Sequence, residues 1–125
     1  MGTVEKKETS LRTPRSAVTL LRTKGFRIRG EDIVLFVYVR NDGSDESRLG
    51  VSSRKMKGAV HRNRIRRRLR NAARYARPFP QGCDLFLIGA STVEELPWQQ
   101  LVEEIQGLMH RAYKRFSIIV DGRKP

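Results

Sequence analysis

Hydrophobic residues are most concentrated in the stretch from Ile33 to Val39, and this stretch predicts a β-strand. All seven residues are β-branched, aromatic or leucine, the types that favour strands. Successive side chains of a strand point to opposite faces, so Val34, Phe36 and Tyr38 share one face and the odd-numbered residues share the other. Because both faces are apolar, we expect one to form the core and the other to be covered.

Two further stretches have the pattern of strands. Residues 48–53 follow a turn-forming segment and are predicted as an antiparallel return strand, with Leu49 and Val51 pointing inward. Residues 84–88 form a nearly continuous apolar run of strand length. Such a run is typical of a central strand that is buried on both faces.

Three helices are predicted from apolar stripes and from the residues that begin and end them. They cover about residues 14–24, 59–77 and 97–116, and prolines lie at the start of the first and third and just after the second. The stripes consist of Ala17, Val18, Leu20 and Leu21 in the first helix, Ile65, Leu69, Ala72, Ala73 and Ala76 in the second, and Trp98, Leu101, Val102, Ile105, Leu108, Met109 and Ala112 in the third.

This order of elements predicts an α+β fold, a two-layer sandwich in which helices cover one face of a small mixed sheet. The 125 residues suit a single domain, which we expect at residues 11–116. We expect tails at residues 1–10 and 117–125, the second of which contains a possible short strand at 118–120. The uncovered face or margin of the sheet is left for a ligand.

The charge balance indicates a polyanionic partner. The chain has 26 Lys and Arg against 13 Asp and Glu, a net charge of +13, and a pI of about 11.0. Such an excess opposes compaction unless a polyanion, first of all nucleic acid, neutralises it. A membrane surface is the alternative, but the sequence has no lipidation motif and no apolar run of signal-peptide or transmembrane length. We therefore expect a cytoplasmic protein that binds no membrane.

The second predicted helix carries the densest charge. Between Ser47 and Cys83 there are twelve Lys and Arg and no acidic residue. Ile65 and Leu69 point into the protein, and the arginines cover the remaining surface. Like charges at helical spacings repel, so this concentration is favoured mainly if phosphates neutralise it. Arginine also clamps phosphate with two hydrogen bonds and stacks on bases, and Asn63 can bridge phosphate and ribose or a base edge.

A solvated charged face is the alternative interpretation of this helix, but such faces usually mix both signs. A nuclear-localisation or heparin-binding patch would be equally basic, yet it would need no apolar stripe. The stripe indicates that the helix is built into the fold.

Several segments resemble the bacterial ribonuclease P protein family. Residues 62–67, Arg-Asn-Arg-Ile-Arg-Arg, look like the family's RNR signature helix. Residues 48–52 resemble the strand before it, residues 82–88 the Gly-x-Asp-apolar strand after it, and Glu95-Leu96 with the last stripe resemble its closing helix. The resemblance covers about residues 11–116, and the strand–helix–strand order is far more specific than the basic cluster alone.

The resemblance implies a fold like the second domain of ribosomal protein S5, with a left-handed βαβ crossover that carries the RNR helix. It implies a subunit of the endoribonuclease that removes the 5′ leader from precursor tRNA. It also implies that the RNA subunit carries the hydrolytic chemistry, with Mg²⁺. We expect no DNA partner.

Two binding surfaces follow from the resemblance: the RNR helix for the catalytic RNA, and a cleft between the first helix and the sheet for the single-stranded leader. The RNA-binding set is Arg54, Lys55, Arg62, Asn63, Arg64, Arg66, Arg67, Arg68 and Arg70. The leader set is Val18, Arg22, Phe36 and Tyr38.

The chain departs from the family in two places. The family usually has aromatic residues one turn apart on the first helix, where this chain has Val18 and Arg22, and Arg22 can instead contact a phosphate. The loop at residues 54–61 is one residue shorter than usual and lacks the common Gly-Asn pair.

The sequence does not predict catalysis by the polypeptide. Cys83 is the only cysteine and is expected beside a strand as a small apolar residue; His61 and His110 are the only histidines. Both histidines are interpreted as surface residues, and the glutamate pairs at 94–95 and 103–104 as solvated helix charge. With no carboxylate cluster, neither acid–base nor metal-dependent hydrolysis is indicated.

Three other functions remain open at this point. A ribosomal or other structured-RNA protein would have a similar composition. A DNA-binding regulator would use residues 59–77 as a recognition helix, but a strand rather than a helix precedes them. An independent ribonuclease would need His61 and His110 as its acid and base.

Overall fold

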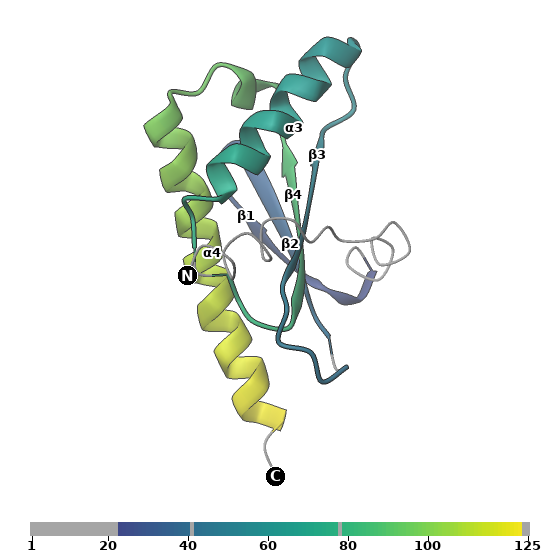
Figure 1. Cartoon of the computed structure of the whole chain (residues 1–125), viewed down its shortest axis with the longest axis vertical. Coiled ribbons are helices and arrows are strands. Elements are labelled where there is room, and N and C mark those ends of the chain that lie inside the picture. The colour runs from purple at the N-terminus through teal and green to yellow at the C-terminus, as the bar shows by residue number, and fades with distance from the viewer. Residues whose placement is uncertain (1–22, 41, 78, 124–125) are drawn as a thin grey trace.

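The computed structural model describes residues 23–40, 42–77 and 79–123, with side chains to residue 117 (Figure 1). The predicted N-terminal tail and almost all of the predicted first helix lie outside these residues. The described elements, in chain order, are β1 (Phe26–Arg29), β2 (Ile33–Val39), β3 (Arg48–Ser53), α3 (Ala59–Ala73), β4 (Cys83–Gly89), the 3₁₀ helix η1 (Ser91–Glu94) and α4 (Trp98–Arg123).

The strands form one sheet in the order β1-β2-β4-β3, and α3 and α4 cover one of its faces (Figure 1). β2 pairs with β1 and with β4 in antiparallel fashion, whereas β3 and β4 are parallel. The predicted α+β fold with a small mixed sheet is confirmed. So is the central position of β4, whose apolar residues are buried or half-buried on both faces.

The prediction of an antiparallel return strand at residues 48–53 is wrong. β3 does not pair with β2, because β4 lies between them and pairs with both. The inward orientation of Leu49 and Val51 is nevertheless correct, since both are buried. Alternation fixes which side chains face the core, but the partner of a strand depends on the rest of the chain.

α3 connects the two parallel strands. In Figure 1 it lies in front of the sheet, and the chain passes from β3 on the right to β4 on its left. A crossover in this direction is left-handed, whereas almost all parallel crossovers are right-handed. The topology implied by the RNR-like segment is therefore present, and it fixes the basic helix between the two strands.

The sequence-based prediction missed β1. Its four residues alternate between partly or fully buried apolar side chains, Phe26 and Ile28, and exposed arginines, Arg27 and Arg29. This alternation was a usable signal, although a strand of four residues between two glycines is short.

The core lies between the sheet and the two helices. It contains the odd-numbered residues of β2 up to Val37, the inward residues of β3 and β4, and the stripes of both helices. α3 packs closely on β4 at Gly89, where an added Cβ would lie 3.1 Å from the side chains of Ile65, Leu69 and Val93. Gly89 thus permits the approach that fixes which face of α3 remains outside.

The helix ends differ from the predictions. α3 ends at Ala73, five residues before the proline that was expected to stop it, and the chain continues as a turn to Ala76. The short strand considered at residues 118–120 is wrong, because α4 continues through Arg123. Trp98 was placed on the buried stripe of α4 but is 42% exposed. None of the described helices is long and apolar enough to cross a membrane.

Candidate nucleic-acid interface

The outer face of α3 carries the predicted RNA-binding arginines. Ile65 and Leu69 are fully buried and fix the rotation of the helix, as their spacing predicted. The opposite face therefore presents Asn63, Arg64 and Arg67 as exposed residues. The other members of the predicted set on this helix, all half-buried, are Arg62, Arg66, Arg68 and Arg70.

Arg68 differs from the other arginines in being used inside the protein. Its guanidinium donates to the backbone oxygens of Val93 at 2.5 Å, Glu94 at 2.8 Å and Leu96 at 2.5 Å. These carbonyls lie at the end of η1 and just after it, so Arg68 ties α3 to the segment that leads into α4. The geometry gives Arg68 a structural role, and its predicted RNA contact stays a prediction.

Glu94 is a functional neighbour that the sequence analysis missed. Its carboxylate lies 2.9 Å from Nδ1 of His61 and 3.3 Å from a guanidinium nitrogen of Arg64. The hydrogen bond from His61, followed by the one from Arg64, holds the pKa of Glu94 below its ordinary value. The interpretation of this glutamate as solvated helix charge is therefore wrong, since it neutralises part of α3.

Two further hydrogen bonds orient other members of the set. Arg62 donates to the backbone oxygen of Met56 at 2.7 Å, and Arg66 donates to Oδ1 of Asn63 at 3.1 Å. Each of the two arginines uses only one of its guanidinium nitrogens in these bonds. An arginine has five N–H donors, so most of them stay available to a phosphate.

The sheet face opposite the helices forms a groove of about 740 Å³, which we call the sheet groove. Strand pairing places its side chains in rows. One row runs Arg27–Phe36–Phe86–Gly50, and the next runs Arg29–Val34–Ile88–Ser52. The described residues that line the groove are Arg27, Arg29, Val34, Phe36, Ser52, Ser53, Arg54, Lys55, Phe86 and Ile88.

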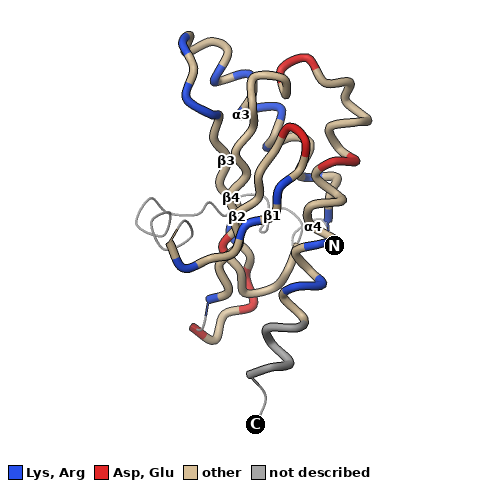
Figure 2. The backbone as a smooth tube through the Cα atoms, turned by 180° about the vertical axis from the view of Figure 1, so that it is seen from behind, with Lys and Arg blue, Asp and Glu red and all other residues tan. Residues whose placement is uncertain are grey.

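The sheet groove has an apolar floor between two basic edges. Figure 2 shows the Lys and Arg positions of β1 and of the loop after β3 on opposite sides of the sheet. Phe36 and Phe86 are directly paired across β2 and β4, so their rings lie on the same face. Phe86 and the two arginines of β1 were missed because they join the site only through strand pairing.

Of the predicted leader set, Phe36 lies in this groove, whereas Tyr38 lies beyond its described lining. Tyr38 occupies the next row of the same face, beside Asp84 and Arg48. Val18 and Arg22 lie outside the described residues. Arg54 and Lys55, which were predicted as a flank of the RNR helix, are exposed at the basic edge of the groove.

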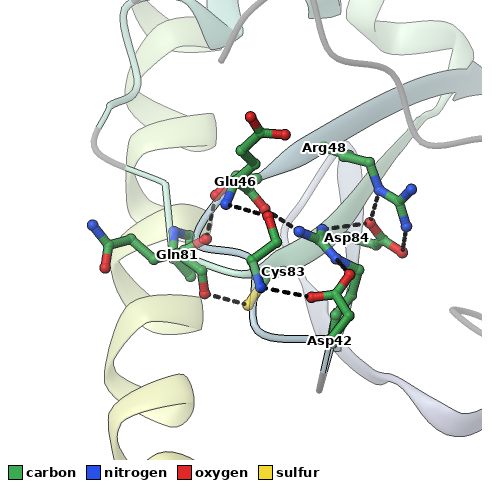
Figure 3. A network of polar contacts seen from close by, with 10 residues as sticks. Asp42, Glu46, Arg48, Gln81, Cys83 and Asp84 are labelled. Carbon is green, nitrogen blue, oxygen red and sulfur yellow. Dashed lines mark hydrogen bonds and ion pairs between the residues drawn. The ribbon is translucent and has the colours of Figure 1, made fainter. Parts of the chain in front are cut away.

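A buried ion cluster supports the end of this face (Figure 3). Asp84, whose side chain is 2% exposed, accepts from Arg48 Nε at 2.6 Å and from Arg40 Nη1 at 2.9 Å. Arg40 also pairs with Asp42 and donates to the backbone oxygen of Glu46. The hydrogen bond to Asp84 raises the pKa of Arg48. Two cations thus compensate one buried carboxylate, which fixes the turn between β2 and β3 against β4.

The histidines are not brought together. His61 is in the first turn of α3, whereas His110 lies on α4 beside Ala76, past the end of α3. The fifteen residues of α3 span about 22 Å, so the two histidines lie near opposite ends of this helix. Among the residues that the structure describes, no group of three His, Cys, Asp or Glu is placed to hold a metal ion. Cys83 is fully buried at the start of β4, as expected.

Comparison with known proteins gives one consistent match. The model of the family described as Ribonuclease P matches residues 6–113. The ribonuclease P protein component of Pelotomaculum thermopropionicum is 36% identical over 90 residues, which cover 71% of this chain and 80% of that protein. The corresponding protein of Lactococcus lactis subsp. cremoris is 37% identical over 87 residues, which cover 69% and 71%.

Solved structures agree with this match. The ribonuclease P protein of Thermotoga maritima superposes with a TM-score of 0.66 at 27% identity, over 80% of this chain and 96% of that one. The Staphylococcus aureus protein, at 21% identity and a TM-score of 0.65, shows the same fold over 80% and 92%. The chain therefore belongs to the ribonuclease P protein family, the protein components that work with an RNA subunit in a tRNA-processing endoribonuclease.

Proposed function

We propose that this chain binds the catalytic RNA subunit of ribonuclease P through α3 and the single-stranded 5′ leader of precursor tRNA through the sheet groove. In this way it assists the endonucleolytic removal of the leader. The observation that carries the proposal is the adjacency of the two surfaces: Arg54 and Lys55 line the groove, and α3 begins four residues later at Ala59. One RNA complex can therefore span both.

The arrangement of α3 supports the first contact. Its outer face carries arginines on a helix whose rotation is fixed by buried Ile65 and Leu69. Glu94 is the one carboxylate that contacts the arginines of this helix among the described ion pairs. Preorganised guanidinium groups on a rigid element lose little freedom when they bind phosphates, and arginine presents two parallel donors to each.

The sheet groove supports the second contact. Phe36 and Phe86 offer ring surface on which bases can stack without regard to sequence, as a leader of variable sequence requires. Arg27 and Arg29 lie on one edge and Arg54 and Lys55 on the other. Four strands span about 14 Å, so a short single strand can place its bases on the floor and its phosphates against a basic edge.

We further propose that hydrolysis, with its bound Mg²⁺, is carried out by the RNA subunit. The chain contributes cations. These reduce the repulsion between two RNA molecules, hold the leader, and favour metal binding by ordering nearby phosphates. No step of the reaction is assigned to a side chain of this protein.

Single-turnover cleavage of a precursor tRNA by the cognate RNA subunit, at low Mg²⁺, tests the proposal. Adding this protein is expected to raise the cleavage rate or the affinity for the precursor. A variant with Arg64→Ala and Arg67→Ala provides the matched control, since both residues are exposed and their loss should leave the fold intact. If the wild-type protein changes neither quantity, the proposed function is wrong.

A further inference from the structure

A second groove lies in the helix layer, where the chain leaves α3 and crosses α4. We call it the helix-side groove. It has a volume of about 460 Å³. Its described lining residues are Ala76, Arg77, Gln106, Met109, His110 and Tyr113. The sheet groove is on the other side of the sheet, so the two are separate sites.

One exposed aromatic ring, Tyr113, lines the helix-side groove, and two further exposed rings lie farther along the helix layer. Tyr113 is 47% exposed on its wall, and Tyr75, 64% exposed, lies one residue before Ala76. The Tyr75 ring packs edge-to-face on Trp98, with centroids 6.1 Å apart. These three are, with Val60, the large hydrophobic residues that stay exposed among the described residues. Exposed rings of this kind usually mark an interaction site, and Tyr113 is the one that faces the groove.

The backbone under these rings is fixed. Gln106 on α4 donates from Nε2 to the backbone oxygen of Tyr75 at 2.9 Å, which ties the turn after α3 to the middle of α4. Met109 and Ala76 are buried beneath it. The rings are therefore presented by rigid elements, so little order has to be gained when a flat ligand binds.

The charge around the helix-side groove favours a polyanion. The described lining residues include two basic residues, Arg77 and His110. None of them carries a carboxylate. Residues 106–117 of α4 contain no Asp or Glu. Basic groups interleaved with exposed rings are the composition of single-stranded RNA sites.

The groove is also continuous with the basic helix. Arg67, Arg70 and Arg74 are at positions i, i+3 and i+7, which lie on one side of α3 and lead toward the turn that carries Tyr75. An RNA that follows the arginines of α3 therefore reaches the helix-side groove at the end of the helix.

We propose that the helix-side groove binds an unpaired nucleotide of the RNA subunit, with its base on the Tyr113 ring and its phosphate at Arg77 and His110. This inference rests on the proposed function, because RNA bound to α3 brings the nucleotide into reach. It assigns α4 a direct role in recognising the RNA subunit, independent of the leader.

The test measures binding of the full chain to the RNA subunit alone, without precursor tRNA. Tyr113→Ala is expected to raise Kd roughly 5- to 100-fold, because stacking of one base is lost. Tyr113→Phe, which keeps the ring, should bind like the wild type. Gln100→Ala, an exposed change elsewhere on α4, is the control for effects on the helix itself.

The outcomes separate this inference from the proposed function. If Arg67→Ala weakens binding but Tyr113→Ala changes it less than twofold, the helix-side groove is not an RNA site and the function proposed for α3 stands. If neither change weakens binding, both proposals fail. If Tyr113→Ala instead abolishes self-association of the free protein in sedimentation, with RNA affinity unchanged, the groove joins two copies and the inference is overturned.

Discussion

α3 and the sheet groove are both basic, but they differ in what lies between the charges. On α3 the apolar stripe is buried, so an RNA meets mainly guanidinium groups, with Val60 in the first turn as the exposed large apolar residue. In the sheet groove the cations lie at two edges, and Phe36 and Phe86 form the floor. The first surface suits the regular phosphates of a folded RNA, and the second suits bases that are free to stack.

The two surfaces also depend on different supports. α3 is held by apolar packing through Ile65, Leu69 and Gly89 and by the internal bonds of Arg68. The sheet face depends at one end on a buried charge cluster around Asp84. Changes to these supports and surfaces should therefore have separable effects, and four of them sharpen the comparison.

The largest effect is expected for Asp84→Ala. Removing this carboxylate leaves Arg40, whose side chain is 7% exposed, without its buried partner, and should lower the free energy of unfolding by about 3 kcal/mol. Urea denaturation measures this change in the free energy of unfolding. Asp42→Ala, which removes an exposed partner of the same arginine, should have little effect. Equal stability of the two variants would contradict a structural role for the cluster.

Phe36→Ala is expected to distinguish leader binding from binding of mature tRNA. Loss of one stacked base should raise the Kd of the holoenzyme for precursor tRNA by about 5- to 100-fold, while the Kd for mature tRNA stays unchanged. Phe86→Ala should behave alike, since the two rings are paired. Fluorescence anisotropy with both ligands measures this, and equal losses for both would show that the groove does not bind the leader.

Arg67→Ala is expected to weaken binding of the RNA subunit about tenfold and to weaken it for any sequence, since the contact is with phosphate. The slope of log affinity against log salt should become shallower by about 1. Arg68→Ala should change the slope less and the melting temperature more, because its guanidinium is bonded to three carbonyls. The reverse ranking would show that Arg68 contacts the RNA.

The smallest effect concerns Glu94. Glu94→Gln removes the carboxylate from His61 and Arg64 and should strengthen RNA binding by about two- to fivefold at low salt, with little effect at high salt. Weaker binding would show that the carboxylate instead orients Arg64 for RNA.

The same residue gives a pH dependence of known sign. The pKa of Glu94 is lower in the folded chain than its ordinary 4.5. Its stabilising contribution is therefore complete above the unfolded pKa and is lost as pH falls through the folded pKa. The wild type should lose slightly more stability than Glu94→Gln between pH 5 and pH 3, by thermal denaturation.

Local pattern was sufficient where a single element decided the outcome. Ile33–Val39 and Cys83–Gly89 are strands, as their short apolar runs predicted, and the rotation of α3 follows from Ile65 and Leu69. Phe36 was placed on the correct face for the same reason. The RNR-like segment then indicated the family, which the comparisons show.

The features of the fold and the site that the sequence did not predict depend on contacts between distant segments. The parallel pairing of β3 with β4 is decided by which strand takes the central place. Phe86 joins Phe36 only through that sheet. Glu94 meets Arg64 thirty residues away, and Arg68 donates to the backbone oxygens of Val93, Glu94 and Leu96. None of these leaves a periodic signal in the chain.

The most direct test of the account is the affinity of the purified chain for the cognate RNA subunit at several salt concentrations. If about six cations contact phosphates, log Kd should rise with log salt at a slope of roughly 4 to 5. A nearly flat dependence, or no binding of structured RNA at moderate ionic strength, would contradict it.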